Sequence, residues 1–90
     1  MYSLAFTHSF KKALKRCVER GCDEEIFKTA AGILEEKGSL PAEYRPHKLH
    51  GRHKGYWECH LQPDWLLVWT QNKKELILTF THTGTHDELF

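Results

Sequence analysis

The 90-residue sequence has no long apolar run and only a small, odd number of cysteines. No stretch approaches the roughly 20 apolar residues of a membrane-spanning helix, so we expect no membrane partner. Residues Met1–Thr7 lack the apolar core of a secretory signal peptide. Cys17, Cys22 and Cys59 are too few for a disulfide scaffold. They predict free thiols and a cytoplasmic protein, because disulfides are rare in a reducing compartment.

Length and composition predict a single folded domain, residues 1–90. The chain is 40% hydrophobic and 12% aromatic, which argues against disorder. The net charge of +1 conceals basic segments at residues 8–22 and 38–57 and acidic segments at residues 23–37 and 58–90. A basic face for a polyanion is compatible with this pattern, although ordinary solvated helix faces explain it equally well.

The first half of the chain predicts one strand followed by two helices. Alternation of Tyr2, Leu4 and Phe6 with smaller residues indicates a short strand. Apolar residues then recur with helical spacing from Phe10 to Val18, after a cap at Thr7 or Ser9 and before Gly21. A second helix is expected between a cap at Asp23 and the closing pair Lys37–Gly38. The short link between them favours an antiparallel helical hairpin.

The second half predicts strands. We expect a basic, His-rich loop over 40–53 with a short extended piece at 48–49, then strands over 56–62, 65–69 and 76–82. Turns are expected at 63–64, 71–74 and 83–86, followed by a short tail. The expected fold class is therefore α+β: an N-terminal strand, a two-helix hairpin and an antiparallel sheet of three or more strands, with the helices on one face.

Two kinds of chemistry are disfavoured. His47, His50 and His53 have regular spacing, but Pro46 and Gly51 argue against a helix that would bring them together, and no accompanying metal motif is present. We therefore expect no metal and no other cofactor. Cys59 and its neighbour His60 should point to opposite faces of a strand, so a buried thiol is expected rather than a nucleophile.

General acid–base cleavage of RNA fits the remaining polar residues better. His60 lies in the first strand of a predicted hairpin and Asp64 lies in its turn. His47 and His86 lie in segments that are expected to be exposed. Imidazoles titrate near neutrality and can remove the 2′-OH proton or protonate the leaving 5′-oxygen. Exposed residues of the basic loop are expected to contact RNA: Arg45, Lys48, His50, Arg52, His53 and Lys54.

Three stretches closely resemble the YafQ-type toxins of the RelE/ParE superfamily: 47–51, 55–69 and 83–90. The most specific parts are Gly-Tyr-x-x-x-His-x-x-Pro-Asp-Trp and the terminal Thr-Gly-Thr-His-x-x-Leu-Phe. The resemblance implies a RelE-like fold and an endoribonuclease that enters the ribosomal A site and cuts translated mRNA. It also implies a cognate antitoxin partner.

The resemblance places catalytic positions on His47, His60, Asp64 and His86, with His86 as general acid and either Asp64 or His60 as base. Trp65 and Phe90 fall on supporting aromatic positions that can contact RNA. Trp65 also opens the most apolar strand and fits the core, and the ring of Phe90 can pack back onto the sheet.

Two positions depart from the family pattern. Trp57 stands where many relatives have Arg, which removes one candidate phosphate-binding cation, and Lys48 stands where a relative has Pro. Two alternatives remain open: the His60, Asp64 and His86 set argues against the first, and the missing Arg at position 57 keeps the second open. One is a ParE-like gyrase inhibitor, which needs no proton-transfer residues, and the other is a catalytically silent RNA- or protein-binding module on the same scaffold.

Overall fold

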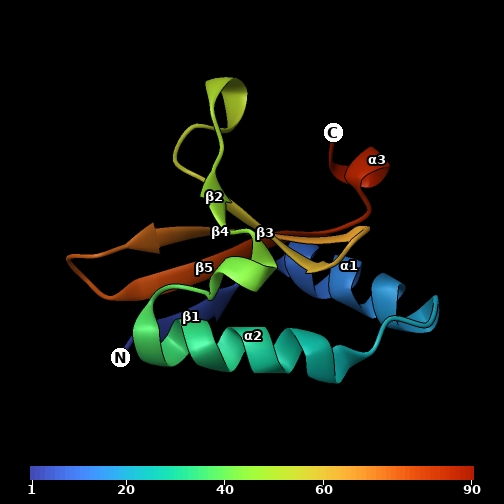
Figure 1. Cartoon of the computed structure of the whole chain (residues 1–90), viewed down its shortest axis with the longest axis horizontal. Coiled ribbons are helices and arrows are strands. Elements are labelled where there is room, and N and C mark those ends of the chain that lie inside the picture. Colours follow the sequence, from blue (N-terminus) through green and yellow to red (C-terminus); the bar gives the residue numbers. More distant parts are fainter.

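A computed structural model describes all residues, 1–90, as a five-stranded sheet with two long helices on one face (Figure 1). The elements are β1 Ser3–Phe6, α1 His8–Glu19, α2 Glu24–Lys37, β2 His47–Lys48, β3 Trp57–Gln62, β4 Trp65–Asn72, β5 Ile77–Gly84 and α3 His86–Leu89, with short 3-10 turns at Ala42–Tyr44 and Gly51–His53. The expected α+β class and element order are confirmed. No helix is both long and apolar enough to cross a bilayer.

The strand order is β1-β5-β4-β3-β2, and every neighbouring pair is antiparallel except β1 with β5. The expected antiparallel sheet is confirmed for β2 to β5, and the N-terminal strand joins its edge in parallel, with Ser3 opposite Ile77. Parallel pairing needs a long crossover, and the helices and the other strands provide it. The last two strands also run further than expected, to Asn72 and Gly84.

The local helix signals act as predicted. The Thr7 hydroxyl accepts a 3.0 Å hydrogen bond from the backbone of Phe10, and Asp23 accepts one from Glu25. Gly38 closes α2 in the left-handed conformation at φ 70°, and the Tyr2 ring occupies the space that a Cβ would need.

The core lies between the helices and one face of the sheet. Phe10 of α1, Phe27 of α2 and Phe80 of β5 pack with ring centroids 5.2–5.5 Å apart. Cys59, Leu67 and Trp69 extend this layer across β3 and β4. The helices meet each other at Phe10 and Phe27 and lie side by side beneath the sheet.

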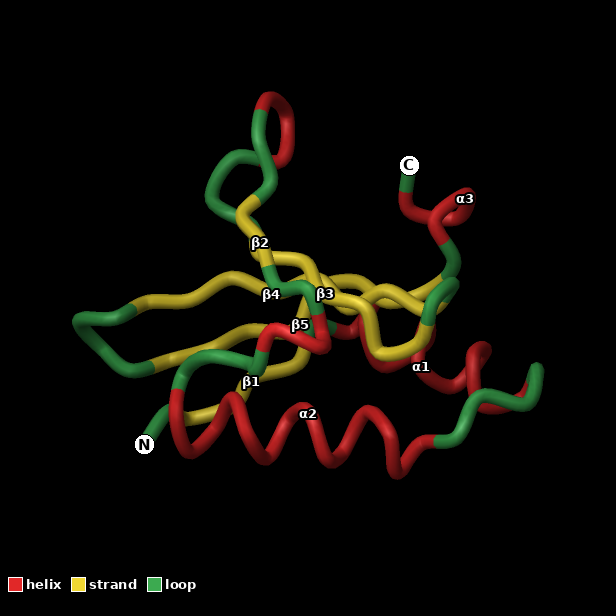
Figure 2. Tube along the Cα trace, in the orientation of Figure 1, coloured by secondary structure: helices red, strands yellow, loops and turns green.

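The opposite face carries β2, the loop at 49–56 and α3, which rise from the sheet on the side away from the helices (Figure 2). Cross-strand register aligns Glu58, Val68 and His82 in one row, and His60, Leu66 and Gly84 in the next. Irregular pairing after His60 and after Val68 interrupts both ladders. Such bulges bend strands and redirect side chains, and here they lie beside the two rows.

Candidate active site

The four expected catalytic residues come from four segments on the face opposite the helices. His47 lies in β2, His60 in β3, Asp64 in the β3–β4 turn and His86 at the start of α3. The His60 ring contacts the backbone of Pro63, next to Asp64, and Asp64 contacts the backbone of His86. His47 is linked to this group through Arg45, whose carbonyl oxygen lies beside the His47 ring and whose guanidinium lies beside the His60 ring.

Asp64 and His86 are brought together although 22 residues separate them. The backbone N–H of His86 donates a 3.4 Å hydrogen bond to Asp64 Oδ1. The sequence predicted a turn and a tail here, but the segment forms a helical turn, because Thr85 and Glu88 make a reciprocal capping box. The cap fixes where α3 begins, and therefore the position from which the His86 side chain projects.

Glu88 also fastens α3 to α1. Its Oε1 accepts from the backbone of Thr85 and its Oε2 accepts from the Arg20 guanidinium, each at 2.8 Å. The Thr85 backbone hydrogen bond and then the Arg20 contact hold the pKa of Glu88 below its ordinary value. The short helix that carries His86 is thus fixed by its cap at Thr85 and by the contact between Glu88 and Arg20.

His60 faces Arg45 across the site. Arg45 adopts the left-handed conformation at φ 50°, and its Nη2 lies 3.4 Å from His60 Nδ1. The carbonyl oxygen of Pro63 lies at the same distance from Nδ1. These contacts leave Nε2 of His60 without a protein partner.

Sequence reasoning missed Glu58, which lies on β3 two residues before His60. It is only 5% exposed, and its Oε1 lies 3.1 Å from His47 Nε2. The alternation of β3 places Glu58 and His60 on the same face, a signal present in the sequence. The pairing of β2 with β3, which brings His47 opposite Glu58, was not predictable from local pattern.

The expected RNA-contacting residues of the basic loop are exposed: Arg45, Lys48, His50, Arg52, His53 and Lys54. A groove of about 790 Å³ separates this loop from the β4–β5 hairpin. Lys73 and Lys74 of that hairpin, which sequence reasoning did not single out, line the groove together with Lys48 and Lys54. Positive charge therefore extends beyond the loop itself.

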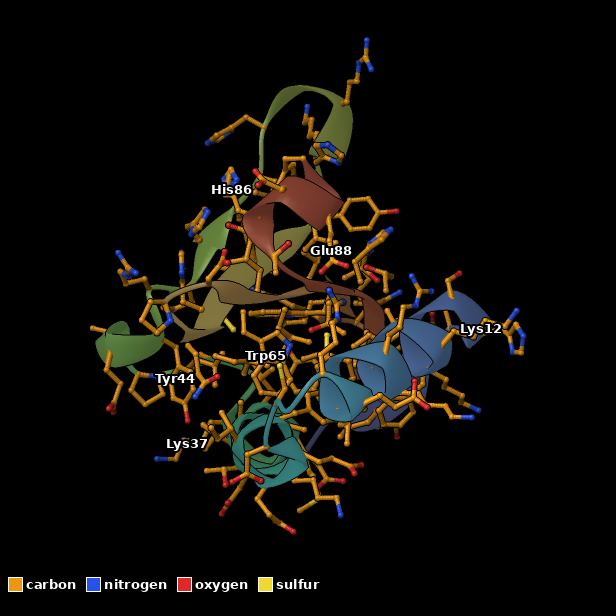
Figure 3. All side chains as sticks on the ribbon, turned by 90° about the vertical axis from the view of Figure 1, so that its right-hand side faces the viewer. Lys12, Lys37, Tyr44, Trp65, His86 and Glu88 are labelled. Atoms are coloured by element: carbon orange, nitrogen blue, oxygen red, sulfur yellow. The ribbon has the colours of Figure 1, made fainter.

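Of the two places expected for Trp65, the core or the RNA-contacting surface, the structure favours the core. Trp65 is 2% exposed, points into the layer between sheet and helices, and donates a 2.8 Å hydrogen bond to Thr83 (Figure 3). Phe90 instead remains 51% exposed, with its ring centroid 5.4 Å from that of His86 and 5.2 Å from that of His53. Of these two aromatic residues, Phe90 is the one whose ring is exposed to a substrate.

The two departures from the family pattern are cross-strand partners. Lys48 pairs with Trp57, and Lys48 Nζ lies 5.5 Å from the Trp57 ring centroid. Trp57 also stacks on Trp69, with the planes only 9° apart. Trp57 packs against the core, on the face of β3 opposite to His60. Position 57 therefore does not point at the candidate site.

Cys59 is buried, as expected, and so is Cys17, whereas Cys22 is half-buried. Burial, followed by the nearby Glu58 charge, raises the pKa of Cys59 to about 12, and burial also raises the pKa of Cys17. Thiolate formation is thus suppressed. No group of three His, Cys, Asp or Glu side chains is arranged to hold a metal ion.

Comparisons of the sequence and of the structure with known proteins agree on one family. Residues 2–90 match the family described as "Bacterial toxin of type II toxin-antitoxin system, YafQ". The "mRNA interferase toxin YafQ" of Escherichia coli (strain K12) is 47% identical over 97% of this chain and 94% of the relative. The Escherichia coli DinJ-YafQ complex contains a chain with 32% identity and a TM-score of 0.89, covering 100% of this chain and 99% of that chain.

A structure described as a metal-bound toxin from Helicobacter pylori is 37% identical with a TM-score of 0.90, and covers all of both chains. The matches extend over nearly the whole chain, and the solved structures share its overall fold. This chain therefore belongs to the YafQ family of bacterial type II toxin–antitoxin toxins.

Proposed function

We propose that this toxin is an endoribonuclease that cuts translated mRNA in the ribosomal A site by metal-independent general acid–base catalysis. The observation that carries the proposal is the contact between Asp64 and His86, which holds a helix-borne imidazole beside the β3–β4 turn, near half-buried His60. The name of the Escherichia coli relative, an mRNA interferase, supports the choice of substrate.

The reaction needs two proton transfers and a positive charge. A base removes the 2′-OH proton, the 2′-oxygen bonds to the adjacent phosphorus, and the bond from phosphorus to the 5′-oxygen breaks. An acid protonates that departing oxygen. The products are a 2′,3′-cyclic phosphate and a 5′-hydroxyl. Each proton-transfer group contributes about 10²- to 10⁴-fold in rate.

We assign the base to His60 and the acid to His86. Donation from Nδ1–H of His60 to the carbonyl oxygen of Pro63 leaves a lone pair on Nε2, which has no protein partner and can accept the 2′-OH proton. Asp64 accepts from the His86 backbone, so its role is to place His86. Imidazoles are also stronger bases than carboxylates near neutral pH.

Positive charge at the phosphate comes from Arg45 and the basic loop. Fixed cations that face the developing phosphorane charge act strongly, because they need no reorganisation during the reaction. Exposed loop cations alone do not orient a scissile bond. The ribosome therefore supplies orientation, which carries several kcal/mol of a barrier in comparable cases.

We further propose a cytoplasmic complex with a cognate antitoxin, by analogy with the DinJ-YafQ complex. Its C-terminal segment is expected to be disordered when free, to fold on binding and to be partly acidic. Basic residues on α1 and around the site provide the complementary charge: Lys11, Lys15, Arg16, Arg45 and Arg52. Complementary charge accelerates encounter, so the association rate should fall with rising salt.

The test is inducible expression in bacteria with mapping of mRNA 5′ ends, comparing wild type with His60→Ala and His86→Ala. His8→Ala is the matched control, because His8 is exposed at the start of α1. We expect cuts within translated frames for wild type and His8→Ala, and at least about 10²-fold less cleavage in the other two. Growth arrest with intact mRNA and a DNA-damage response would instead identify a gyrase inhibitor.

A second arm addresses metal dependence. Cleavage by purified toxin on ribosome-bound mRNA should persist when a chelator selective for zinc and copper is added and Mg²⁺ is retained for the ribosome. Loss of activity that returns on adding zinc or copper would contradict the metal-independent mechanism.

A further inference from the structure

Two of the three cysteines lie together at the turn that joins α1 to α2. The backbone N–H of Cys22 donates a 3.0 Å hydrogen bond to the carbonyl oxygen of Cys17, and Gly21 donates one of the same length to Val18. Gly21 has the positive φ of 106° that this turn requires. The two bonds form a Schellman motif, which ends a helix and brings the first and last residues of the turn into contact.

The side chains of the two cysteines also approach each other. Cys17 belongs to the core and is 3% exposed, and half-buried Cys22 packs against the same core. Burial raises the pKa of the Cys17 thiol, and the neighbouring Cys22 thiol raises it further. A disulfide requires backbones that lie close together and side chains that converge. The turn provides both, whereas Cys59 lies within the sheet on β3.

The two thiols differ in accessibility. Cys22 can be reached from solvent, whereas Cys17 is covered. A sulfenic acid that forms on an accessible thiol condenses with a second thiol held beside it. The raised pKa makes Cys17 a slow nucleophile toward reagents in solution. Its fixed position beside Cys22 offsets this, because a held reactant has a high effective concentration.

We propose that Cys17 and Cys22 form a reversible disulfide when the toxin is exposed to a hydroperoxide. The Cys22 sulfur bonds to the terminal peroxide oxygen, the O–O bond breaks, and the leaving oxygen takes the thiol proton to give an alcohol or water. The Cys17 sulfur then bonds to the Cys22 sulfur, the S–O bond breaks, and hydroxide leaves as water with the Cys17 proton. The two sulfurs thereby lose two electrons to the peroxide, and a dithiol reductant reverses the oxidation.

The disulfide closes a ring that contains Arg20, which contacts Glu88 of α3 at the same end of the molecule (Figure 1). The sulfur atoms must approach to about 2.05 Å. Cys17 is fixed in the core, whereas a Cβ at Gly21 would have no neighbour within 4 Å, so the turn is the part that can move. We expect this shift to weaken the contact with Glu88 and to loosen the helix that carries His86. This consequence rests on the proposed function, in which His86 is the acid.

Peptide mass spectrometry tests the bond itself. Reduced toxin is treated with hydrogen peroxide, its remaining thiols are alkylated after unfolding, and it is digested with trypsin, which cuts after Arg20. We expect peptides 17–20 and 21–28 to be joined by a disulfide and Cys59 to be alkylated. Cys59→Ala, the matched control, should give the same joined peptides. Two free thiols, a sulfinic acid on Cys22, or a disulfide between two copies of the chain would overturn the proposal.

The Thr85 amide reports the effect on α3 without a substrate, because it donates to Glu88. Its NMR signal should shift on oxidation, return with a dithiol reductant, and stay unchanged in peroxide-treated Cys22→Ala. A disulfide that leaves this signal unchanged would overturn the link between the turn and α3.

Cleavage provides the last readout. After the peroxide is removed, oxidised wild type should cut ribosome-bound mRNA roughly tenfold more slowly than reduced wild type, within the range of small misplacements near a reacting group. Cys22→Ala should be unaffected by the treatment. Equal cleavage by oxidised and reduced wild type would overturn the regulatory effect. Absence of cleavage by reduced wild type would refute the proposed function instead, while the joined peptides and the amide signal still decide whether the disulfide forms and reaches α3.

Discussion

The Arg20 guanidinium, just after α1, donates a 2.8 Å hydrogen bond to Glu88 Oε2 in α3. This contact joins the helical layer on one side of the sheet to the short helix that carries His86 on the other. α3 has only four residues, so it depends on its cap and on this contact for a fixed orientation.

We expect Arg20→Met to lower mRNA cleavage by roughly tenfold, less than the roughly 10²-fold cost of a 1 Å misplacement. The melting temperature should change little, because the pair is solvent-exposed. Lys12→Met on the same helix is the control, since Lys12 has no contact with α3. Unaltered cleavage in Arg20→Met would show that the cap alone positions His86.

The same carboxylate predicts a pH dependence. The pKa of Glu88 is lowered in the folded state, so its stabilisation of α3 is fully present above the ordinary value of 4.5. It is lost as the pH falls through the lowered folded-state value. The Thr85 amide, which donates to Glu88 Oε1, should therefore show an NMR titration step below pH 4.5 that is absent in Glu88→Gln. A step at or above pH 4.5 would contradict this assignment.

Lys48 and Trp57 should be energetically coupled. In a double-mutant cycle with Lys48→Met and Trp57→Leu, we expect a coupling energy of about 0.5–1 kcal/mol from the cation–π contact. Trp57→Arg should destabilise the fold by about 1 kcal/mol or more, because it removes the stacking on Trp69 and opposes two positive charges. Urea unfolding measures both, and purely additive effects would argue against the contact.

Cys59 is expected to be inert. Its pKa of about 12 leaves almost no thiolate at pH 8, so iodoacetamide should not label it in the folded protein. Cys59→Ala should destabilise the fold by about 1–2 kcal/mol through lost packing, with cleavage per folded molecule unchanged. Rapid labelling of Cys59 with loss of activity would contradict the prediction that this thiol is inert.

Local signals predicted local structure well. Thr7, Asp23 and Gly38 cap helices through contacts within a few residues, and the apolar run after Trp65 forms the central strand. Relationships that depend on distant register were missed, including the parallel pairing of β1 with β5 and the pairing of β2 with β3 that places His47 opposite Glu58. No local pattern encodes them.

The end of the chain illustrates a second limit. The capping box of Thr85 and Glu88 was visible in the sequence as Thr-x-x-Glu, but four residues are too few for a helical period. Trp65 had been assigned both to the core and to RNA, and burial against Thr83 selects the core. In both cases tertiary contacts decide what the residue type alone left open.

The central claim is that the 2′-hydroxyl of the mRNA is the nucleophile and that His86 protonates the leaving oxygen. The most direct measurement follows cleavage of ribosome-bound mRNA carrying a single 2′-deoxynucleotide at the scissile position, beside an all-ribose copy, with analysis of the product ends. We predict that wild type cuts only the all-ribose mRNA and leaves a 2′,3′-cyclic phosphate and a 5′-hydroxyl, with His86→Ala slower by about 10²-fold or more. Cleavage of the deoxy-substituted mRNA, or products with a 3′-hydroxyl and a 5′-phosphate, would contradict the account.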